Sequence, residues 1–343
     1  MRRRISGFGP ALGRRTPLAI GAVLLLALVA AGCGENDQST LAPKSSASDQ
    51  IARLWWVMLV ASAVIFGVVL VLLFVAVLRR RGAEPATTKG GGLWIPAVGG
   101  IAIPVVVLTA LFALTLRTLP KTSPAAASAT GLTIDVVGRQ WFWDVSYPDK
   151  DVRTANELHI PVGVPVNVEV SSADVVHSFW VPELNRKIDM IPGQVNRVTL
   201  EADRAGVYRG QCAEFCGLQH AHMAFYVVAE PRAAFDAWLA REAKPAPAPA
   251  TPELERGQQV LLGSACVYCH TIDGTNASGK IGPDLTHLAS RRSLAAGLIP
   301  NSPGYLAGWI LDPQHVKPGN KMPATDLSGT DLQALLAYLE SLK

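Results

Sequence analysis

Two long apolar runs stand out in the N-terminal part of the chain. They cover Ile51–Leu78 and Leu93–Leu116, and each exceeds the roughly 20 residues that a helix needs to cross the hydrocarbon layer of a membrane. The segment between them, "RRRGAEPATTKGGG", contains three arginines and Lys89, which favour the cytoplasmic side. We therefore predict a transmembrane helix hairpin over 51–118, with the rest of the mature chain outside the cytoplasmic membrane. Runs of this length disfavour the alternative, two buried helices of a soluble protein.

The segment before the first run has the pattern of an exported protein. The basic stretch "MRRRISGFGPALGRR" precedes the apolar run Leu18–Ala31 and the sequence "AAGC", which ends at Cys33, so we predict a signal peptide over 1–32. A cysteine directly after small residues also resembles a bacterial lipoprotein signal. Lipidation of Cys33, ordinary cleavage and a retained anchor all stay open. Residues 33–50 are expected to form a flexible N-terminal segment.

Beyond the hairpin, the pattern changes to short segments of alternating apolar and polar residues. Within Gly131–Glu230 these segments are separated by Gly, Pro, Asn and Asp. The apolar positions Val166, Val168 and Val170 mark a core-facing side. The segments are "LTIDVVG", "QWFWDVSYP", "VPVNVEVSS", "VNRVTLEA", "GVYRGQ" and "MAFYVVAE". This organisation predicts an all-β sandwich or Greek-key barrel over 128–231.

A helical pattern follows the strands. The sequence "PRAAFDAWLAREAK" favours a short helix, and "PAPAPATP" is an extended linker of polyproline type, so residues 232–252 separate two domains. Over 253–343, the segments "ELERGQQVLLG" and "LSGTDLQALLAYLESLK" predict an all-α domain. Ser328 is the expected N-cap of the last helix, with Asp331 three residues further on.

Composition and charge limit the range of partners. The hydrophobic content of 49% is concentrated before residue 120, and the remainder is typical of a soluble chain. The net charge of +4 owes much to the signal and to the cytoplasmic loop. Because the exported part contains no basic patch interleaved with aromatic residues, we expect no nucleic acid partner.

The sequence "CVYCH" in the last domain is the attachment signature of c-type haem. The thiols of Cys266 and Cys269 add to the haem vinyl groups, and His270 becomes the proximal iron ligand. A disulfide or half of a zinc site is the alternative, but no second cysteine pair follows to complete a zinc site. Export supports covalent haem, because c-type attachment occurs outside the cytoplasm.

Met322 in "GNKMPA" is the expected second axial ligand of that haem. It is the only methionine after the linker, and a thioether opposite histidine suits electron transfer rather than oxygen chemistry. His287 and His315 are the rival ligands. The domain resembles a small class I cytochrome c, and this resemblance places the carbonyl of Pro283 against the far ring nitrogen of His270.

A second set of soft side chains lies in "YRGQCAEFCGLQHAHMAFYVV". Thiolate, imidazole and thioether together favour copper, whereas hard cations prefer carboxylates and a structural zinc site has no need of a methionine. The donors are Cys212, Cys216, His220, Met223 and, upstream at a strand end in "DVVHSFWVP", His177. Two bridging thiolates can hold two copper ions with a histidine on each. The alternative is a disulfide, which leaves the other donors unexplained.

This pattern closely resembles subunit II of haem–copper cytochrome c oxidases, which carries the dinuclear CuA centre. The resemblance covers two membrane helices, a cupredoxin-like β-domain and, as in variants fused to a cytochrome c, the tail, so it extends from about residue 45 onward. It implies that Cys212 and Cys216 bridge the coppers and that His177 and His220 are terminal ligands.

The same resemblance assigns the weaker contacts of the copper site. Met223 and the backbone carbonyl of Glu214 become axial ligands, and the Glu214 carboxylate faces a magnesium ion at the contact with subunit I. His222 lies two residues past His220 and is off the family spacing. We expect it to be solvated or hydrogen-bonded rather than a ligand.

Two further positions bear on function through the resemblance. In "GRQWFWDVSYP", Trp141 would be the surface point where electrons enter, although Trp141, Phe142 and Trp143 could instead serve packing alone. Many family members carry a glutamate three residues before the tryptophan that opens the second membrane helix. Here Gly91 precedes Trp94 at that spacing, so proton uptake through this chain is in doubt.

The resemblance implies the subunit of a bacterial proton-pumping terminal oxidase at which electrons enter. Electrons would pass from a cytochrome c or a bc-type complex to haem c, to CuA and then to haem a of subunit I, where oxygen is reduced to water. The expected partners are subunit I with haem a and CuB, subunit III and membrane lipid, with the copper and haem domains on the outer face of the cytoplasmic membrane. The alternatives are the relay of a nitric oxide reductase and a membrane-anchored copper-binding or copper-delivery protein. Quinol-oxidase relatives of the family lack the copper ligands, so the presence of these ligands argues against a quinol oxidase.

Overall fold

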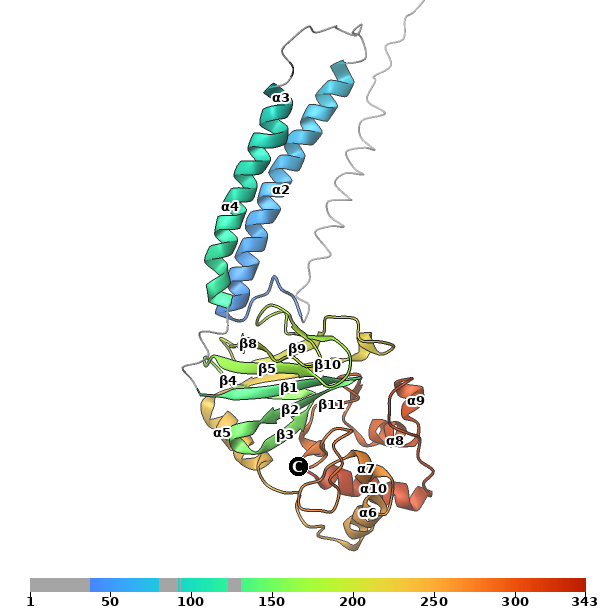
Figure 1. The fold of residues 1–343 in the computed structure, drawn as a ribbon. Coiled ribbons are helices and arrows are strands. Elements are labelled where there is room, and N and C mark those ends of the chain that lie inside the picture. Colours follow the sequence, from blue (N-terminus) through green and yellow to red (C-terminus); the bar gives the residue numbers. More distant parts are fainter. Residues whose placement is uncertain (1–37, 80–91, 93, 123–130) are drawn as a thin grey trace, which may run out of the picture. The chain divides into compact units, whose positions relative to one another are not determined.

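The computed structural model describes residues 38–79, 92, 94–122 and 131–343 (Figure 1). The predicted signal peptide, Cys33 and Gly91 lie outside these residues. Two apolar helical segments come first and contact each other (Figure 1). They are α2 (Ser46–Arg79) and the continuous run of α3 (Trp94–Ala97), the π-helical η2 (Val98–Ala102), α4 (Ile103–Thr118) and the 3₁₀ turn η3 (Leu119–Thr122). Both segments are long and apolar enough to cross a membrane, and this suggests membrane anchoring.

Local chemistry explains where these helices begin and bend. Helix α2 starts five residues before its apolar run because Ser45 and Ser48 form a reciprocal cap, in which each backbone N–H donates to the other hydroxyl at 3.1 and 3.0 Å. The π-helical turn η2 lies just before Pro104, which has no N–H to donate to Gly100.

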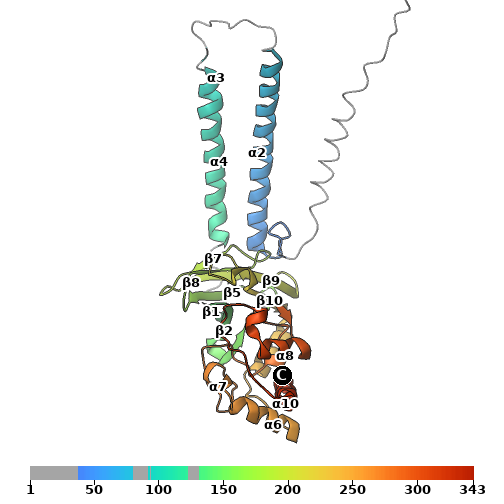
Figure 2. The same cartoon turned by 90° about the vertical axis from the view of Figure 1, so that its right-hand side faces the viewer.

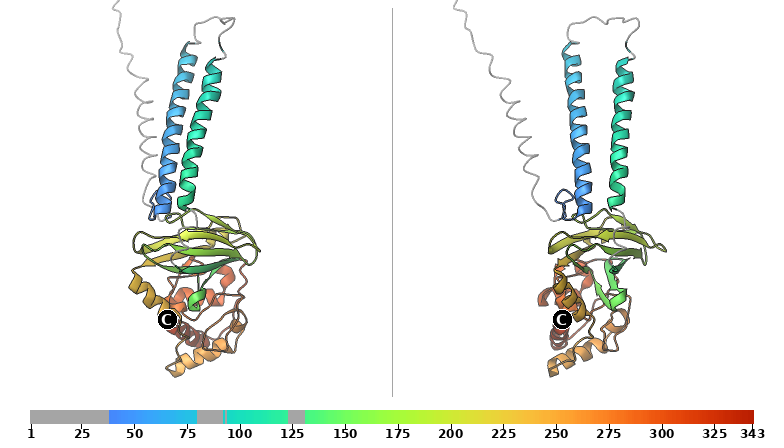
Figure 3. Two further views of the ribbon diagram at one scale, coloured as in Figure 1. Left: turned by 60° about the vertical axis from the view of Figure 1, so that its left-hand side comes forward. Right: turned by 90° about the vertical axis from the view of Figure 1, so that its left-hand side faces the viewer.

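The next part is a sandwich of two five-stranded sheets (Figures 2 and 3). One sheet has the order β3-β2-β1-β5-β8 and the other β4-β10-β9-β6-β7. The strands are β1 (Thr133–Arg139), β2 (Phe142–Tyr147), β3 (Val152–Ala155), β4 (Glu157–Pro161), β5 (Val166–Ser172), β6 (His177–Trp180), β7 (Ile188–Met190), β8 (Asn196–Leu200), β9 (Gly206–Cys212) and β10 (Ala224–Glu230), with a 3₁₀ turn, η5 (Pro148–Lys150), between β2 and β3. The predicted cupredoxin-like β-domain is confirmed.

Alternating side chains fill the space between the sheets. In β5 the three valines predicted to face the core are fully buried. Trp143, Phe179 and Phe225 lie at the centre, with their ring centroids 4.6 to 6.0 Å apart. Four strands lack an alternating segment in the sequence: β3, β4, β6 and β7. The five residues of β4 are all buried, because β10 flanks this strand and α5 packs on it, so no polar face is left to reveal the period.

A helix and an extended linker lead to the C-terminal helical region. Helix α5 (Arg232–Glu242) packs Phe235, Trp238 and Leu239 against the sandwich. The helical region contains α6 (Pro252–Leu262), α7 (Cys266–Cys269), η7 (Leu288–Ser290), a small hairpin of β11 (Ser293–Leu294) and β12 (Ile299–Pro300), α8 (Pro303–Leu311), α9 (Pro313–Val316) and α10 (Gly329–Ser341). The side chain of Ser328 accepts the N–H of Asp331, as predicted for the N-cap of the last helix.

Helices α6 and α10 form the main packing contact of the helical region (Figure 3). They pack closely at Gly257, where a Cβ atom would lie 2.0 Å from the carbonyl oxygen of Ala334. Tyr338 and Leu261 are buried beside this contact. The predicted helical domain is confirmed, with the short β11–β12 hairpin in addition, and Cys266 and Val267 pack against its core.

Candidate functional site

Two cysteines and a histidine converge at one end of the sandwich. Cys212 ends β9, Cys216 lies four residues further along the cysteine loop (residues 212–223), and His177 begins the neighbouring strand β6. The two Sγ atoms are 3.7 Å apart, and Nδ1 of His177 is 3.8 Å from Sγ of Cys212. All three side chains are buried, and their ligand atoms lie within 4.8 Å of one another. Because a disulfide needs about 2.05 Å, this is a pair of free thiols.

The remaining predicted donors surround the same thiols. Nδ1 of His220 is 3.6 Å and Sδ of Met223 is 3.8 Å from Sγ of Cys216. The backbone carbonyl oxygen of Glu214 is 3.2 Å from Sγ of Cys212, whereas its carboxylate lies on an exposed residue. The structure thus brings together every residue that the resemblance named as a copper ligand. His222 instead places Nδ1 2.8 Å from Oε1 of Gln219, as expected for a hydrogen-bonded histidine.

Backbone hydrogen bonds hold the cysteine loop in this shape. The N–H of Cys212 donates to the carbonyl of Met223 at 2.9 Å and therefore closes the base of the loop. The N–H of His220 donates to the carbonyl of Gly217 at 3.1 Å. Across the site, a Cβ atom on Gly138 would lie 2.9 Å from Cδ2 of His177, so only glycine leaves the imidazole its present position.

Asp174 is a functional residue that the sequence did not reveal. Its Oδ1 is 2.8 Å from Nε2 of His177, and its Oδ2 accepts the backbone N–H of Gln140 at 2.7 Å. Burial by itself would raise the pKa of Asp174, but the hydrogen bonds from His177 and from backbone N–H groups hold this pKa below its ordinary value. The ionised carboxylate orients the ring, so that Nδ1 faces the thiols. An acid three residues before a ligand was the available signal.

The electrostatics of the thiol pair indicate a cation site. The hydrogen-bonding contact with Cys216 lowers the pKa of Cys212 well below its ordinary value, against the opposing effect of burial. The same contact and burial raise the pKa of Cys216. Two thiolates 3.7 Å apart repel each other, so both ionise only when a cation lies between them. Soft sulfur and imidazole donors favour copper for that cation.

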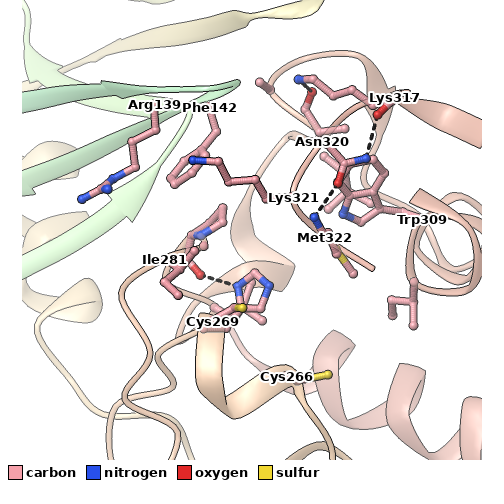
Figure 4. Close-up of a pocket in the computed structure, with 18 of the residues that line it drawn as sticks. Arg139, Phe142, Cys266, Cys269, Ile281, Trp309, Lys317, Asn320, Lys321 and Met322 are labelled. Atoms are coloured by element: carbon pink, nitrogen blue, oxygen red, sulfur yellow. Dashed lines mark hydrogen bonds between the residues drawn. The ribbon is translucent and has the colours of Figure 1, made fainter. Parts of the chain in front are cut away.

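A cavity of about 450 Å³ lies in front of helix α7, which presents the thiols of Cys266 and Cys269 (Figure 4). His270 lines the same cavity, and its Nδ1 is 2.7 Å from the carbonyl oxygen of Pro283, as the resemblance to cytochrome c implied. Burial lowers the pKa of His270, which favours the neutral imidazole that iron binds. The donor set and the cavity together fit a covalently attached haem.

Met322 lines this cavity opposite the cysteines, and the rival histidines do not (Figure 4). His287 is buried elsewhere, with Nε2 3.0 Å from the carbonyl oxygen of Lys244. His315 is exposed. Of the three candidate second ligands, only Met322 lines the cavity that His270 also lines.

Comparison with known proteins identifies the family of this chain. The family model of the cytochrome c oxidase subunit II periplasmic domain matches residues 150–230, and that of cytochrome c matches residues 254–343. Cytochrome c oxidase subunit 2 of Alkalihalophilus pseudofirmus is 34% identical over 329 residues, which cover 93% of this chain and 95% of the relative. The chain belongs to the cytochrome c oxidase subunit II family.

A further relative and a solved structure have similar descriptions. Cytochrome c oxidase subunit 2 of Bacillus sp. strain PS3 is 31% identical over 349 residues, covering 93% of this chain and 95% of the relative. The crystal structure of the periplasmic domain of cytochrome oxidase subunit II from Bradyrhizobium japonicum is 33% identical and covers 33% of this chain and 93% of that chain, with a TM-score of 0.32. As a subunit II with a cytochrome c domain, the protein takes part in electron transfer beside subunit I of a haem–copper oxidase, and its two domains imply copper and haem.

In this subunit II, Trp141 lies between the two sites. Its indole N–H donates to the carbonyl of Cys216 at 3.0 Å, and the residue also lines the cavity in front of α7. Trp143 is fully buried in the sandwich core, so the two tryptophans have different roles. Arg139 and Phe142 from the sandwich line the cavity too, and the wall of the haem site is therefore built by both domains (Figure 4).

Proposed function

We propose that this chain is the subunit through which electrons enter a proton-pumping terminal oxidase. When bound, the haem and the copper pair would carry electrons from a cytochrome c or a bc-type complex to haem a of subunit I, where oxygen is reduced to water. The observation that carries the proposal is Trp141, which contacts the cysteine loop and lines the cavity at the "CVYCH" segment. Trp141 therefore links the two proposed redox sites through a single residue.

The proposed ligands follow from the convergence of the donors. Two copper ions would be bridged by Cys212 and Cys216, and the other donors to them would be His177, His220, Met223 and the carbonyl of Glu214. The haem would be attached to Cys266 and Cys269, with His270 and Met322 as axial ligands. The exposed Glu214 carboxylate would face a magnesium ion at the contact with subunit I.

The surrounding residues hold these ligands in position. Asp174 fixes the ring of His177 through the 2.8 Å contact with Nε2, and the carbonyl of Pro283 fixes His270 in the same way. Trp141 would then act as a bridge within this chain instead of a surface point for a separate donor, since it is partly covered and lines the cavity.

We further propose a topology with both long apolar segments across the bacterial cytoplasmic membrane and the copper and haem domains on its outer face. The basic segment between the apolar runs supports a cytoplasmic loop. Subunit III and membrane lipid complete the expected surroundings. The domain boundaries proposed from the sequence place the sandwich at 128–231 and the haem domain at 253–343.

Copper delivery is the main alternative from another functional class. Delivery requires exposed ligands that exchange readily, whereas Cys212 and Cys216 are only 4% and 2% exposed. Purification of the native complex, with an oxygen-uptake assay and typing of the co-purifying haems, separates a terminal oxidase from a nitric oxide reductase relay. Oxygen uptake that depends on this chain supports our proposal, and nitric oxide consumption without oxygen uptake contradicts it.

The ligand assignment is tested by paired variants of the cysteine loop in the assembled complex. We expect His220→Asn to lose copper and His222→Asn, its matched control, to keep it, because of these two histidines only His220 faces a thiol. Cys216→Ser should abolish reoxidation of haem c, whereas Met223→Leu should keep copper and slow the reaction. Copper content and the rate of haem c reoxidation are measured for each variant. Full copper in Cys216→Ser with loss in Met223→Leu would reverse the proposed roles.

The distal haem ligand is tested by Met322→Ala. We expect a lower haem reduction potential and loss of the sulfur-to-iron absorption band in the near infrared. Replacement of His287 or His315 by alanine is the matched control and should leave that band in place, since neither residue lines the cavity. An unchanged spectrum in Met322→Ala would refute the assignment.

A further inference from the structure

Lys317 is a buried lysine at the contact between the helical region and the sandwich. It follows α9 and is only 2% exposed. Its ammonium group donates three hydrogen bonds to backbone carbonyl oxygens: to Trp141 at 2.9 Å, His222 at 2.7 Å and Ala295 at 2.8 Å. Two of these acceptors belong to the sandwich and the third belongs to the helical region. An ammonium group has three protons, so every one of them is used.

The burial of this charge needs a structural reason. Burying an ammonium group is costly unless its protons are all accepted. No ion pair of Lys317 with a carboxylate occurs among the described residues, so the carbonyl dipoles replace a counterion. Burial lowers the pKa of Lys317 to about 7, and the nearby Cys216 opposes this change. A neutral amine could donate to only two of the three carbonyls, so the three hydrogen bonds favour the ammonium form against the effect of burial.

Neighbouring contacts tie the same two regions together. The side-chain amide of Gln219 donates to the carbonyl of Pro318 at 2.7 Å, and the N–H of Ala224 donates to the carbonyl of Ala296 at 3.0 Å. Farther from the cysteine loop, the N–H of Arg292 donates to Oε2 of Glu157 at 2.9 Å. The backbone of Gly319 also lies close to the side chain of Leu218, because a Cβ atom on this glycine would be 3.0 Å from Cδ2 of the leucine.

We propose that Lys317 is a positioning residue that locks the helical region onto the cysteine loop. Its bonds to the carbonyls of Trp141 and His222 fix the position of the helical region relative to the sandwich. Trp141 is thereby placed against the cavity of the helical region. Because one ammonium group donates all three hydrogen bonds, release of the contact would break them together, so the lock acts as a unit. The effect on electron transfer rests on the proposed function, whereas the docking itself does not.

The lock is tested in the assembled complex with Lys317→Met, which keeps the length of the side chain and removes its charge. The exposed Lys244→Met is the matched control, because it removes the same charge without losing a side-chain contact. Hydrogen exchange is measured at the amides of Ala224 and Arg292, which both bond across the contact. We expect exchange at least about tenfold faster in Lys317→Met, since hydrogen bonds from charged donors are among the stronger ones. Lys244→Met should match the wild type.

A measurement on the wild-type complex tests the proposal even if Lys317→Met fails to assemble. Acetylation of the wild-type complex by an amine-reactive ester, located by mass spectrometry, should modify Lys244 and spare Lys317. Modification of Lys317 as fast as Lys244, or unchanged exchange at both amides in Lys317→Met, would overturn the proposal. Electron transfer from haem c should slow in the variant. Faster exchange with an unchanged transfer rate would uphold the lock and count against the proposed relay through Trp141.

Discussion

Replacement of Gly282 by alanine should displace the imidazole of His270. A Cβ atom at this position would lie 2.6 Å from Cε1 and 2.9 Å from Nδ1 of the ring. The backbone has little freedom to retreat, because the N–H of Gly282 donates to the carbonyl of Cys269 at 2.7 Å. The ring therefore has to move, and it is the same ring that is proposed to bind the haem iron.

The size of the effect follows from these distances. Non-bonded carbon atoms lie about 3.5 Å apart at closest favourable contact, so Cε1 must recede by about 0.9 Å. Such overpacking costs about 1–3 kcal/mol. The 2.7 Å contact between Nδ1 and the carbonyl of Pro283 would also be strained, and a lost hydrogen bond adds about 1 kcal/mol. We expect the free energy of unfolding of the helical region to fall by roughly 2–4 kcal/mol.

Denaturant unfolding of the haem-loaded chain, followed by the Soret band, measures this change. Gly308→Ala in α8 is the matched control, because it adds the same methyl group to an exposed helical position with no atom within 4 Å. Alanine should stabilise that helix by about 0.5–1 kcal/mol, so the two variants are expected to have opposite signs. Stability and a haem spectrum equal to the wild type in Gly282→Ala would refute the steric argument.

Two further predictions concern other parts of the chain. Gly138→Ala should push the ring of His177 away from the thiols and lower the copper content, which metal analysis would detect, and full copper would contradict the close contact of 2.9 Å. The hydrogen bond from Ser328, followed by that from Arg256, lowers the pKa of Asp331 below its ordinary 3.8. The ionised carboxylate therefore stabilises the folded state above pH 3.8, and this stabilisation is lost as the pH falls through the lowered pKa. Asp331→Asn should remove this part of the acid sensitivity in unfolding measured against pH, and an unchanged pH profile would contradict it.

Local patterns explain why most of the fold and the donor residues were predictable. The apolar runs, the alternating strands and "CVYCH" each lie within a short stretch of sequence, and the fold class predicted from them is confirmed. Four of the five side chains expected to bind copper lie within twelve residues of one another in the cysteine loop. His177 was named as a candidate from its position at a strand end, but its place beside Cys212 depends on the pairing of β6 with β9, which the sequence does not show.

The features that the sequence did not reveal all depend on contacts between distant segments. Lys317 lies in "HVKPGN", a polar turn whose lysine would ordinarily be exposed, and its burial arises only when a second domain covers it. Trp141 was predicted as the surface point of electron entry, and its contact with the helical region could not be predicted because that region is far away in sequence. The spacing of Asp174, three residues before His177, was its only signal in the sequence, because its role follows from the turn that brings its carboxylate back to the imidazole.

The ratio of copper to haem c tests the central claim most directly. The chain from residue 131 to its C-terminus, purified with its haem and loaded with copper, would be assayed for both by elemental analysis and by haem absorbance. The convergence of two free thiols with two imidazoles predicts two copper ions for each haem. One copper ion for each haem, or a chain that binds haem and no copper, would contradict a dinuclear site in the cysteine loop.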